Sequence, residues 1–85
     1  MGRSGRERPK HLGRKLALIR ERLGLTQPEM IKLLNVKQQL YPAAISLFEK
    51  GDREPTALVL LRYARVYGCS VEELIDDKMK LPEQK

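Results

Sequence analysis

The chain has 85 residues and a hydrophobic fraction of 41%, which suits one small globular domain. Its single cysteine excludes an internal disulfide, and no apolar run approaches the roughly 18 residues that a membrane-spanning helix needs. Leucine dominates and β-branched runs are missing, so we predict an all-α fold. The basic N-terminus lacks the apolar stretch of a signal peptide, and we expect the protein in the cytoplasm.

The positive charge is concentrated at the N-terminal end. Eight cationic and two acidic residues precede Leu25, and the +6 that they leave equals the net charge of the whole chain. Residues 1–9 contain Arg3, Arg6 and Arg8 with two glycines and a proline, and we predict a disordered basic arm. Such an arm suits a polyanion, since each cation can neutralise a phosphate, but it equally suits a solvated tail without a partner.

The first two helices have clear sequence signals. Over residues 10–23, apolar residues recur at helical spacing from Leu12, and Gly24 follows as a stop signal. The second helix is predicted to start after Thr26, which forms a capping box with Glu29. Its apolar face is expected to comprise Met30, Ile31, Leu33 and Leu34, with Asn35 as a left-handed cap.

Three further helices follow. Pro42 suits the first position of a helix over residues 42–49, which Gly51 ends. Thr56 is expected to cap a fourth helix that reaches Tyr67, and Ser70 a fifth. The inward positions predicted for the fourth helix are Leu58, Leu61, Ala64 and Tyr67 or Val66. We therefore expect one helical domain over residues 10–77 and a frayed C-terminal tail over residues 78–85.

The order of these motifs resembles the Cro/repressor helix-turn-helix family. The marks are Arg20, Leu23-Gly24-Leu25-Thr26-Gln27, Ile45-Ser46, Phe48-Glu49-Lys50-Gly51, Glu54-Pro55 and Gly68 followed by Ser70-Val71-Glu72-Glu73-Leu74. The resemblance spans about residues 12–75 and implies a compact five-helix bundle of the lambda-repressor-like type. It also implies double-stranded DNA as the partner.

The resemblance assigns roles to individual positions. Arg20 matches an arginine that pairs with the glutamate at Glu49. Gln27 matches a residue at a helix N-terminus that contacts phosphate, which agrees with the free N–H groups there. Lys50 and Arg53 flank a turn where the family places further phosphate contacts. Arg3, Arg6 and Arg8 resemble basic arms that wrap the duplex in some members.

The chain departs from the family pattern between the second and third helices. Val36 and Ile45 are nine residues apart, where the family usually has five, so the turn is longer. Ile31 stands where the family usually has alanine, because the crossing helices approach closely there. A longer turn would allow a wider spacing of these helices and so compensate for the larger side chain. The positions that usually touch base edges fall on Pro42, Ala43 and Leu47, which lack side-chain hydrogen-bonding groups.

Three explanations for this base-reading face stay open. The inserted turn can read bases through Lys37, Gln38, Gln39 and Tyr41, which we favour because glutamine pairs with adenine. Binding can instead rest on phosphates and DNA shape. The face can also have become a surface for another protein. Ala43, Ser46 and Leu47 complete the candidate DNA contacts.

These patterns predict a sequence-specific DNA-binding transcriptional regulator, a small stand-alone repressor, and not an enzyme. The alternatives are a protein-interaction module, such as an antitoxin-like partner, and a nonspecific DNA-coating protein. His11 is the only histidine and no catalytic or metal-binding set is evident, so we expect no cofactor or metal. A homodimer is expected through the fifth helix and the tail, with Leu74, Ile75, Met79 and Leu81 as its apolar surface.

Overall fold

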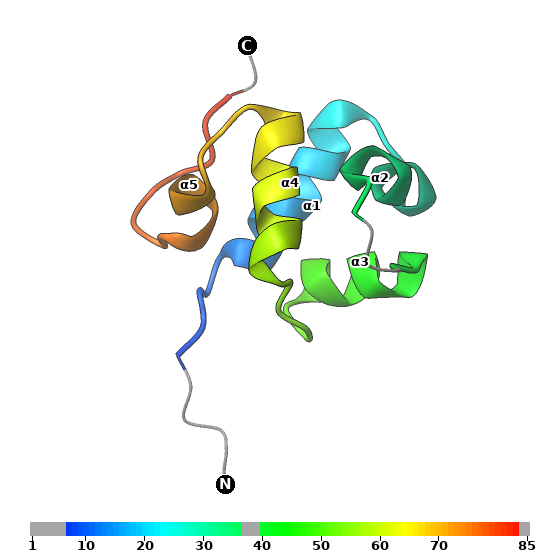
Figure 1. Ribbon diagram of the computed structural model, residues 1–85. Coiled ribbons are helices and arrows are strands. Elements are labelled where there is room, and N and C mark those ends of the chain that lie inside the picture. The colour runs from blue at the N-terminus through cyan, green and yellow to red at the C-terminus, as the bar shows by residue number, and fades with distance from the viewer. Residues whose placement is uncertain (1–6, 37–39, 84–85) are drawn as a thin grey trace, which may run out of the picture.

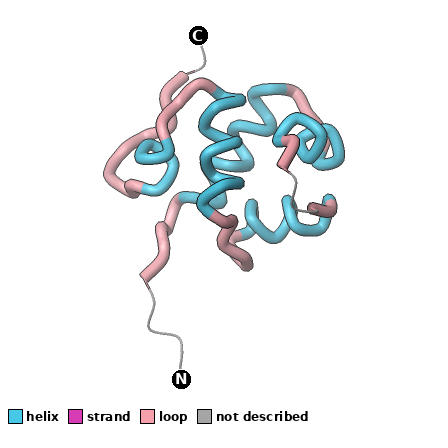
Figure 2. Tube along the Cα trace, in the orientation of Figure 1, coloured by secondary structure: helices cyan, strands magenta, loops and turns pink. Residues whose placement is uncertain are grey.

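Five α-helices make up the fold in the computed structural model, which describes residues 7–36 and 40–83. They are α1 (Leu12–Leu23), α2 (Gln27–Leu34), α3 (Pro42–Lys50), α4 (Ala57–Tyr67) and α5 (Val71–Ile75). Within these described ranges the chain contains no strand (Figure 2). The predicted all-α, five-helix architecture is confirmed.

The helix ends lie where the capping residues predicted them. Thr26 and Ser70 each accept the backbone N–H three residues on, and Glu29 and Glu73 complete both capping boxes. Four helices end at a residue in the left-handed conformation, namely Gly24, Asn35, Gly51 and Gly68. Because these ends satisfy part of their own backbone, their boundaries are set locally.

The core lies where α4 crosses α1, with α5 on one side and α2 and α3 on the other (Figure 1). The side chains that are fully buried come from all five helices: Leu16, Ile19, Met30, Leu34, Ile45, Val59, Tyr63 and Leu74. All of these fully buried side chains except Tyr63 are aliphatic or methionine.

The predicted inward faces of α2 and α4 were partly wrong. Leu33 is 44% exposed and Leu58 is 49% exposed. In α4 the predicted Ala64 and Tyr67 are buried, together with Val59, Leu60 and Tyr63, which were not predicted. The run of four apolar residues from Leu58 fits two adjacent helix faces equally well, and packing against α1 and α2 selects the second.

The C-terminal segment is not a frayed tail over its described part. The Tyr67 hydroxyl donates a hydrogen bond to the Pro82 carbonyl over 2.6 Å, and Arg22 Nη1 donates to the same carbonyl over 3.2 Å. Leu81 packs against the core. Leu74 is fully buried, so its place in the predicted dimer surface was wrong. Leu81 is partly buried and offers less surface than predicted.

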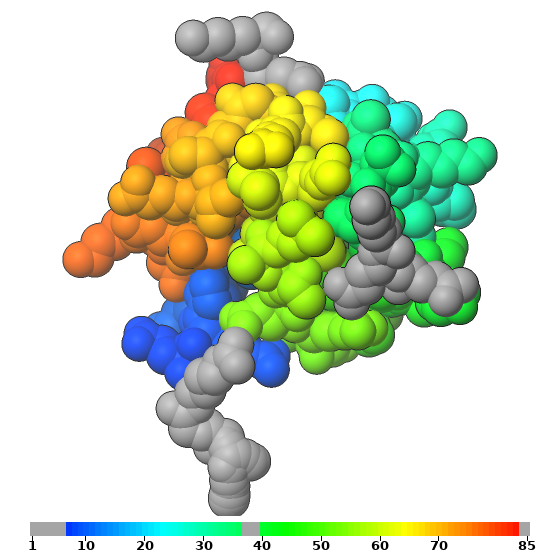
Figure 3. Space-filling view, viewed as in Figure 1, coloured from blue at the N-terminus to red at the C-terminus, as the bar shows by residue number. Residues whose placement is uncertain are grey.

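Asp77 caps α1 across the fold. Its Oδ2 accepts the backbone N–H of Lys10 over 2.8 Å and its Oδ1 that of His11 over 3.0 Å, which holds the start of α1 against the turn after α5. The first described residues, drawn in blue, accordingly adjoin the orange segment around α5 in Figure 3. His11, at the N-cap position, provides no side-chain cap itself.

We expect this cap to make stability depend on pH. The two backbone hydrogen bonds, helped by the charges of His11 and Lys15, hold the pKa of Asp77 below its ordinary value. The contact therefore stabilises the fold above the unfolded carboxyl pKa of about 4, and the stabilisation is lost as pH falls through the lower folded pKa. Urea unfolding of the wild type and Asp77→Ala should differ near neutral pH and converge in acid. A constant difference at all pH values would contradict the assignment.

Candidate nucleic-acid interface

Helix α3 has a buried face and an outward face of different chemistry. Ala44, Ile45 and Phe48 are buried against the rest of the bundle. Ala43 and Lys50 are exposed, Leu47 is 36% exposed and Ser46 is half-buried. The positions that the resemblance assigns to base reading therefore face outward, although Ala43 and Leu47 offer only apolar contact, of the kind made with thymine methyl groups.

The segment between α2 and α3 is anchored at both described ends. Val36 and Leu40 are partly buried and pack against the core. Tyr41 follows in an extended conformation, immediately before Pro42 starts α3, and is 59% exposed. Its ring and hydroxyl are thus available beside the outward face of α3. Lys37, Gln38 and Gln39 lie outside the described residues.

The candidate phosphate contacts lie at the start of α2, at the end of α3 and in the turn that follows α3. Gln27 is the first residue of α2 and is half-buried, directly after the Thr26 cap. Lys50 is the exposed last residue of α3. Arg53 is exposed in the following turn, with its guanidinium 5.9 Å from the centroid of the Phe48 ring. This stacking leaves the charge at the surface while it orients the side chain.

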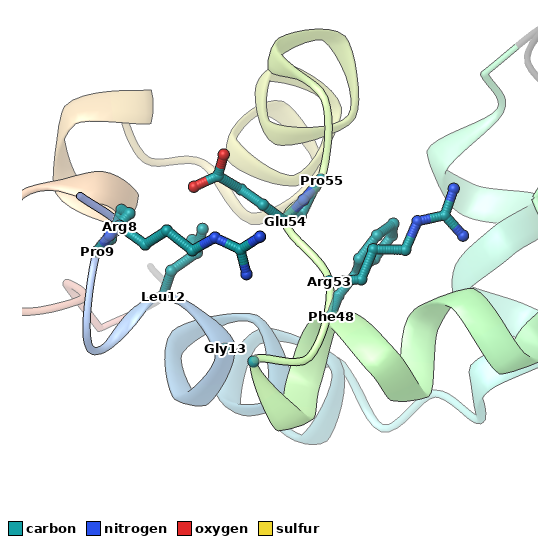
Figure 4. Close-up of a pocket in the computed structure, with 9 residues that line it drawn as sticks. Arg8, Pro9, Leu12, Gly13, Phe48, Arg53, Glu54 and Pro55 are labelled. Atoms are coloured by element: carbon teal, nitrogen blue, oxygen red, sulfur yellow. The ribbon is translucent and has the colours of Figure 1, made fainter. Parts of the chain in front are cut away.

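Arg8 takes a different direction from Arg53. It lines a small pocket between α1 and the turn after α3, together with Leu12, Gly13, Phe48 and Glu54. Figure 4 shows Arg8 extending into this space, while Arg53, which also lines the pocket, directs its guanidinium over the Phe48 ring. Arg8 is exposed and lies beside this pocket, and the disordered basic arm over residues 1–9 stays a prediction. Arg3 and Arg6 lie outside the described residues.

Arg20 and Glu49 form a bidentate pair between α1 and the end of α3. Arg20 Nε donates to Glu49 Oε2 over 2.7 Å and Nη2 donates to Oε1 over 3.1 Å. Arg20 Nη1 also donates to the Leu25 carbonyl over 3.0 Å. Only 20% of the Arg20 side chain and 10% of the Glu49 side chain are exposed. This pair fixes α3 relative to α1, and therefore the direction in which the outward face points.

Not all cations near the N-terminus are free to bind a polyanion. Lys15 is 6% exposed, and its Nζ donates to the Glu73 and Asp76 carbonyls over 2.9 and 3.0 Å. It thus satisfies carbonyls at the C-terminal end of α5, as cations do at helix ends. Arg22 donates to Tyr67 and Pro82. The simple count of N-terminal cations overestimated the charge available to a partner.

The Tyr63 hydroxyl is buried beside the ion pair and has no hydrogen-bond partner among the described residues. Burial raises its pKa, and the charge of Glu49 adds to the shift. Since an unpartnered buried hydroxyl is destabilising, Tyr63→Phe should raise the unfolding free energy by about 1 kcal/mol.

Tyr67→Phe is the matched control for Tyr63→Phe. Tyr67 is equally buried, but its hydroxyl donates to Pro82 and accepts from Arg22. Its removal should lower the unfolding free energy by about 1 kcal/mol. Denaturant titration of both variants measures the contrast, and a loss of stability in Tyr63→Phe would mean that water satisfies its hydroxyl.

Three other features of the described residues concern metal binding, membrane spanning and thiol reactivity. They contain no group of three or more His, Cys, Asp or Glu side chains placed to hold a metal ion. Over the same ranges, no helix combines the length and the apolar character needed to cross a bilayer. Cys69 is half-buried, and burial raises the pKa of its thiol, which disfavours the reactive thiolate.

Comparison with known proteins agrees with this arrangement. A family model described as a helix-turn-helix domain matches residues 11–76. Among solved structures, the P22 c2 repressor protein, crystallised in complex with synthetic operator 9T in the presence of Tl+, is similar with a TM-score of 0.66. It is 26% identical in sequence, and the match covers 78% of this chain and 94% of that chain. No curated protein is significantly similar in sequence. The chain therefore belongs to the helix-turn-helix domain family, with the Cro/repressor type of fold.

Proposed function

We propose that this protein is a sequence-specific DNA-binding transcriptional regulator that acts as a small repressor by occupying an operator. The observation that carries the proposal is the outward face of α3, which is exposed in a fold shared with an operator-bound repressor. Two exposed cations, Lys50 and Arg53, lie at the C-terminal end of α3 and in the next turn. Cations beside an exposed helix face suit phosphate contacts while the helix docks into the major groove of DNA.

In this proposal, phosphate binding and base reading belong to different residues. Gln27, Lys50 and Arg53 bind phosphates, and the N-terminal arm with Arg3, Arg6 and Arg8 adds charge. Base contacts come from Tyr41 and the segment with Lys37, Gln38 and Gln39, assisted by Ala43, Ser46 and Leu47. Tyr41 connects the base-reading segment to α3, since it is exposed and directly precedes that helix.

Two variants should separate these roles. Lys50→Ala removes a phosphate contact, so it should weaken binding to all duplexes alike and reduce the salt dependence by about one counterion. Gln38→Ala with Gln39→Ala should reduce the preference for the operator over a scrambled duplex, by about tenfold, with little change in nonspecific affinity. Fluorescence anisotropy titrations measure both effects. Unchanged discrimination in the double variant would exclude base reading by these glutamines.

The apolar positions of α3 allow an independent measurement on the DNA. Replacing thymine by uracil in the operator removes only the methyl groups. If the wild type binds the uracil operator more weakly than the thymine operator, and Leu47→Ala binds both equally, Leu47 contacts the thymine methyl groups.

A dimer on a two-fold operator is the second part of the proposal. Ile75, which is 42% exposed, and Met79, which is half-buried, remain available near α5. Sedimentation with and without operator DNA tests this, and a monomeric mass in both would contradict it.

A protein-interaction module is the second candidate function. The exposed surface formed by Tyr41, Pro42, Ala43 and Leu47 favours it, because four neighbouring side chains there offer mostly apolar area. Failure to bind any DNA, with the fold intact, would place this function first.

A further inference from the structure

A groove runs between α1 and the C-terminal segment, and the proposed DNA-binding function does not use it. One stripe of α1 forms one wall, and the segment after α5 forms the other. The groove has a volume of about 400 Å³ and is lined by His11, Arg14, Lys15, Leu18, Arg22, Asp77, Met79, Lys80 and Leu81. We call it the α1–tail groove. Figure 1 places the segment after α5 on the side of the bundle away from α3.

The walls of the α1–tail groove are held in place by hydrogen bonds across the fold. Lys15 donates to the Asp76 carbonyl, Arg22 donates to the Pro82 carbonyl, and Asp77 accepts the backbone N–H groups of Lys10 and His11. Three contacts therefore fix the segment after α5 against α1 along its length. A groove that is already formed loses less conformational entropy when it binds a ligand.

The charge of the α1–tail groove is strongly unbalanced. Arg14 and Lys80 are exposed, and neither has a carboxylate partner in the described part of the chain. Arg22 hydrogen-bonds within the fold through one nitrogen, Nη1, and keeps its charge at the edge of the groove. Asp77 is the only carboxylate in the lining, and both of its oxygens accept backbone N–H groups.

Between these cations lies an apolar floor. Leu18, Met79 and Leu81 line the same groove. Met79 is half-buried and unbranched, so it can adapt its shape to an incoming side chain. Phosphate groups of DNA would use the cations but leave these apolar side chains without a partner. An acidic peptide with an apolar residue complements both features.

We propose that the α1–tail groove is a docking site for an acidic, amphipathic segment of another protein. Leucine-like side chains of that segment pack on Leu18, Met79 and Leu81, while its carboxylates pair with Arg14, Arg22 and Lys80. Because this face is separate from the outward face of α3, the partner and DNA can bind together. The proposal does not depend on the proposed DNA-binding function.

The test uses the full chain and a short synthetic peptide in which leucines alternate with glutamates. A matched peptide with glutamine in place of each glutamate removes the charge and keeps the apolar groups. In two-dimensional NMR titrations, the acidic peptide should shift the signals of Leu18, Met79 and Leu81. The glutamine peptide should bind at least about tenfold more weakly, since it loses every ion pair.

Charge reversal at the groove provides the variant control. Arg14→Glu with Lys80→Glu should weaken binding of the acidic peptide by about tenfold or more without altering the circular dichroism spectrum. Met79→Ala should weaken the binding of both peptides and leave the ratio of their affinities unchanged.

Three results would overturn the proposal. The acidic peptide could leave the groove signals unshifted, the two peptides could bind equally, or the acidic peptide could shift only α3 and Gln27. A duplex that shifts the Met79 and Leu81 methyl signals would assign the groove to DNA instead. If the wild type binds the acidic peptide but no DNA, the result would count against the proposed DNA-binding function and leave the groove proposal standing.

Discussion

Replacing Gly13 by alanine should lower the unfolding free energy by about 2 kcal/mol, although alanine normally stabilises a helix relative to glycine by about 1 kcal/mol. Gly13 lies in the first turn of α1, against the C-terminal end of α3. A Cβ atom there would lie 2.8 Å from the Phe48 carbonyl oxygen and 2.8 Å from the Glu49 carbonyl oxygen. Both contacts are to backbone, so the helices must move apart to accommodate a methyl group.

Denaturant unfolding measures this effect, with Arg14→Ala as the control. Arg14 is the next residue of the same helix and is exposed, so its replacement should change the unfolding free energy by less than about 0.5 kcal/mol. If Gly13→Ala is as stable as the wild type, or more stable, α1 and α3 do not approach as closely as described. The close approach also positions α3, so the variant should weaken DNA binding beyond its effect on folding.

The second large effect is expected at the Arg20–Glu49 pair. Arg20→Met should lower the unfolding free energy by about 3 kcal/mol, because it leaves a carboxylate that is 10% exposed without its partner. It also removes the hydrogen bond to the Leu25 carbonyl. Most of the loss is therefore the cost of a buried, unpaired charge and an unsatisfied carbonyl.

The double variant Arg20→Met with Glu49→Leu separates these contributions. It removes both charges, so it should recover more than half of the stability that Arg20→Met loses. The single variant Arg20→Lys should be less stable than this double variant, since an ammonium group cannot bind a carboxylate through two parallel hydrogen bonds. If Arg20→Met alone unfolds as the wild type does, the pair does not hold α3 against α1.

The sequence predicted the parts of the fold that depend on near neighbours. Thr26 with Glu29, and Ser70 with Glu73, set helix starts through contacts three residues apart, and such contacts can be read directly from spacing. The Arg20–Glu49 pairing came from the family resemblance, because no rule of spacing connects residues 29 positions apart.

Contacts between distant parts of the chain could not be predicted in this way. Asp77 caps α1 from 66 residues away, and Lys15 satisfies carbonyls of α5 from 58 residues away. Neither residue carries a local signal for its role: Lys15 counts as one more N-terminal cation, and no neighbour of Asp77 in the sequence indicates a cap for α1. The need for glycine at position 13 likewise depends on the contact between α1 and the end of α3. The base-reading segment at Gln38 and Gln39 stays a prediction from the sequence.

The most direct test of DNA recognition is a comparison of one selected duplex with its scrambled counterpart. The full chain selects duplexes from a random-sequence pool, and fluorescence anisotropy then measures its affinity for the selected and scrambled duplexes at two salt concentrations. We predict discrimination of about 10³-fold or more, retained at the higher salt while both affinities fall. Equal affinity for the two duplexes would contradict sequence-specific regulation, and absence of binding to either would contradict DNA as the partner.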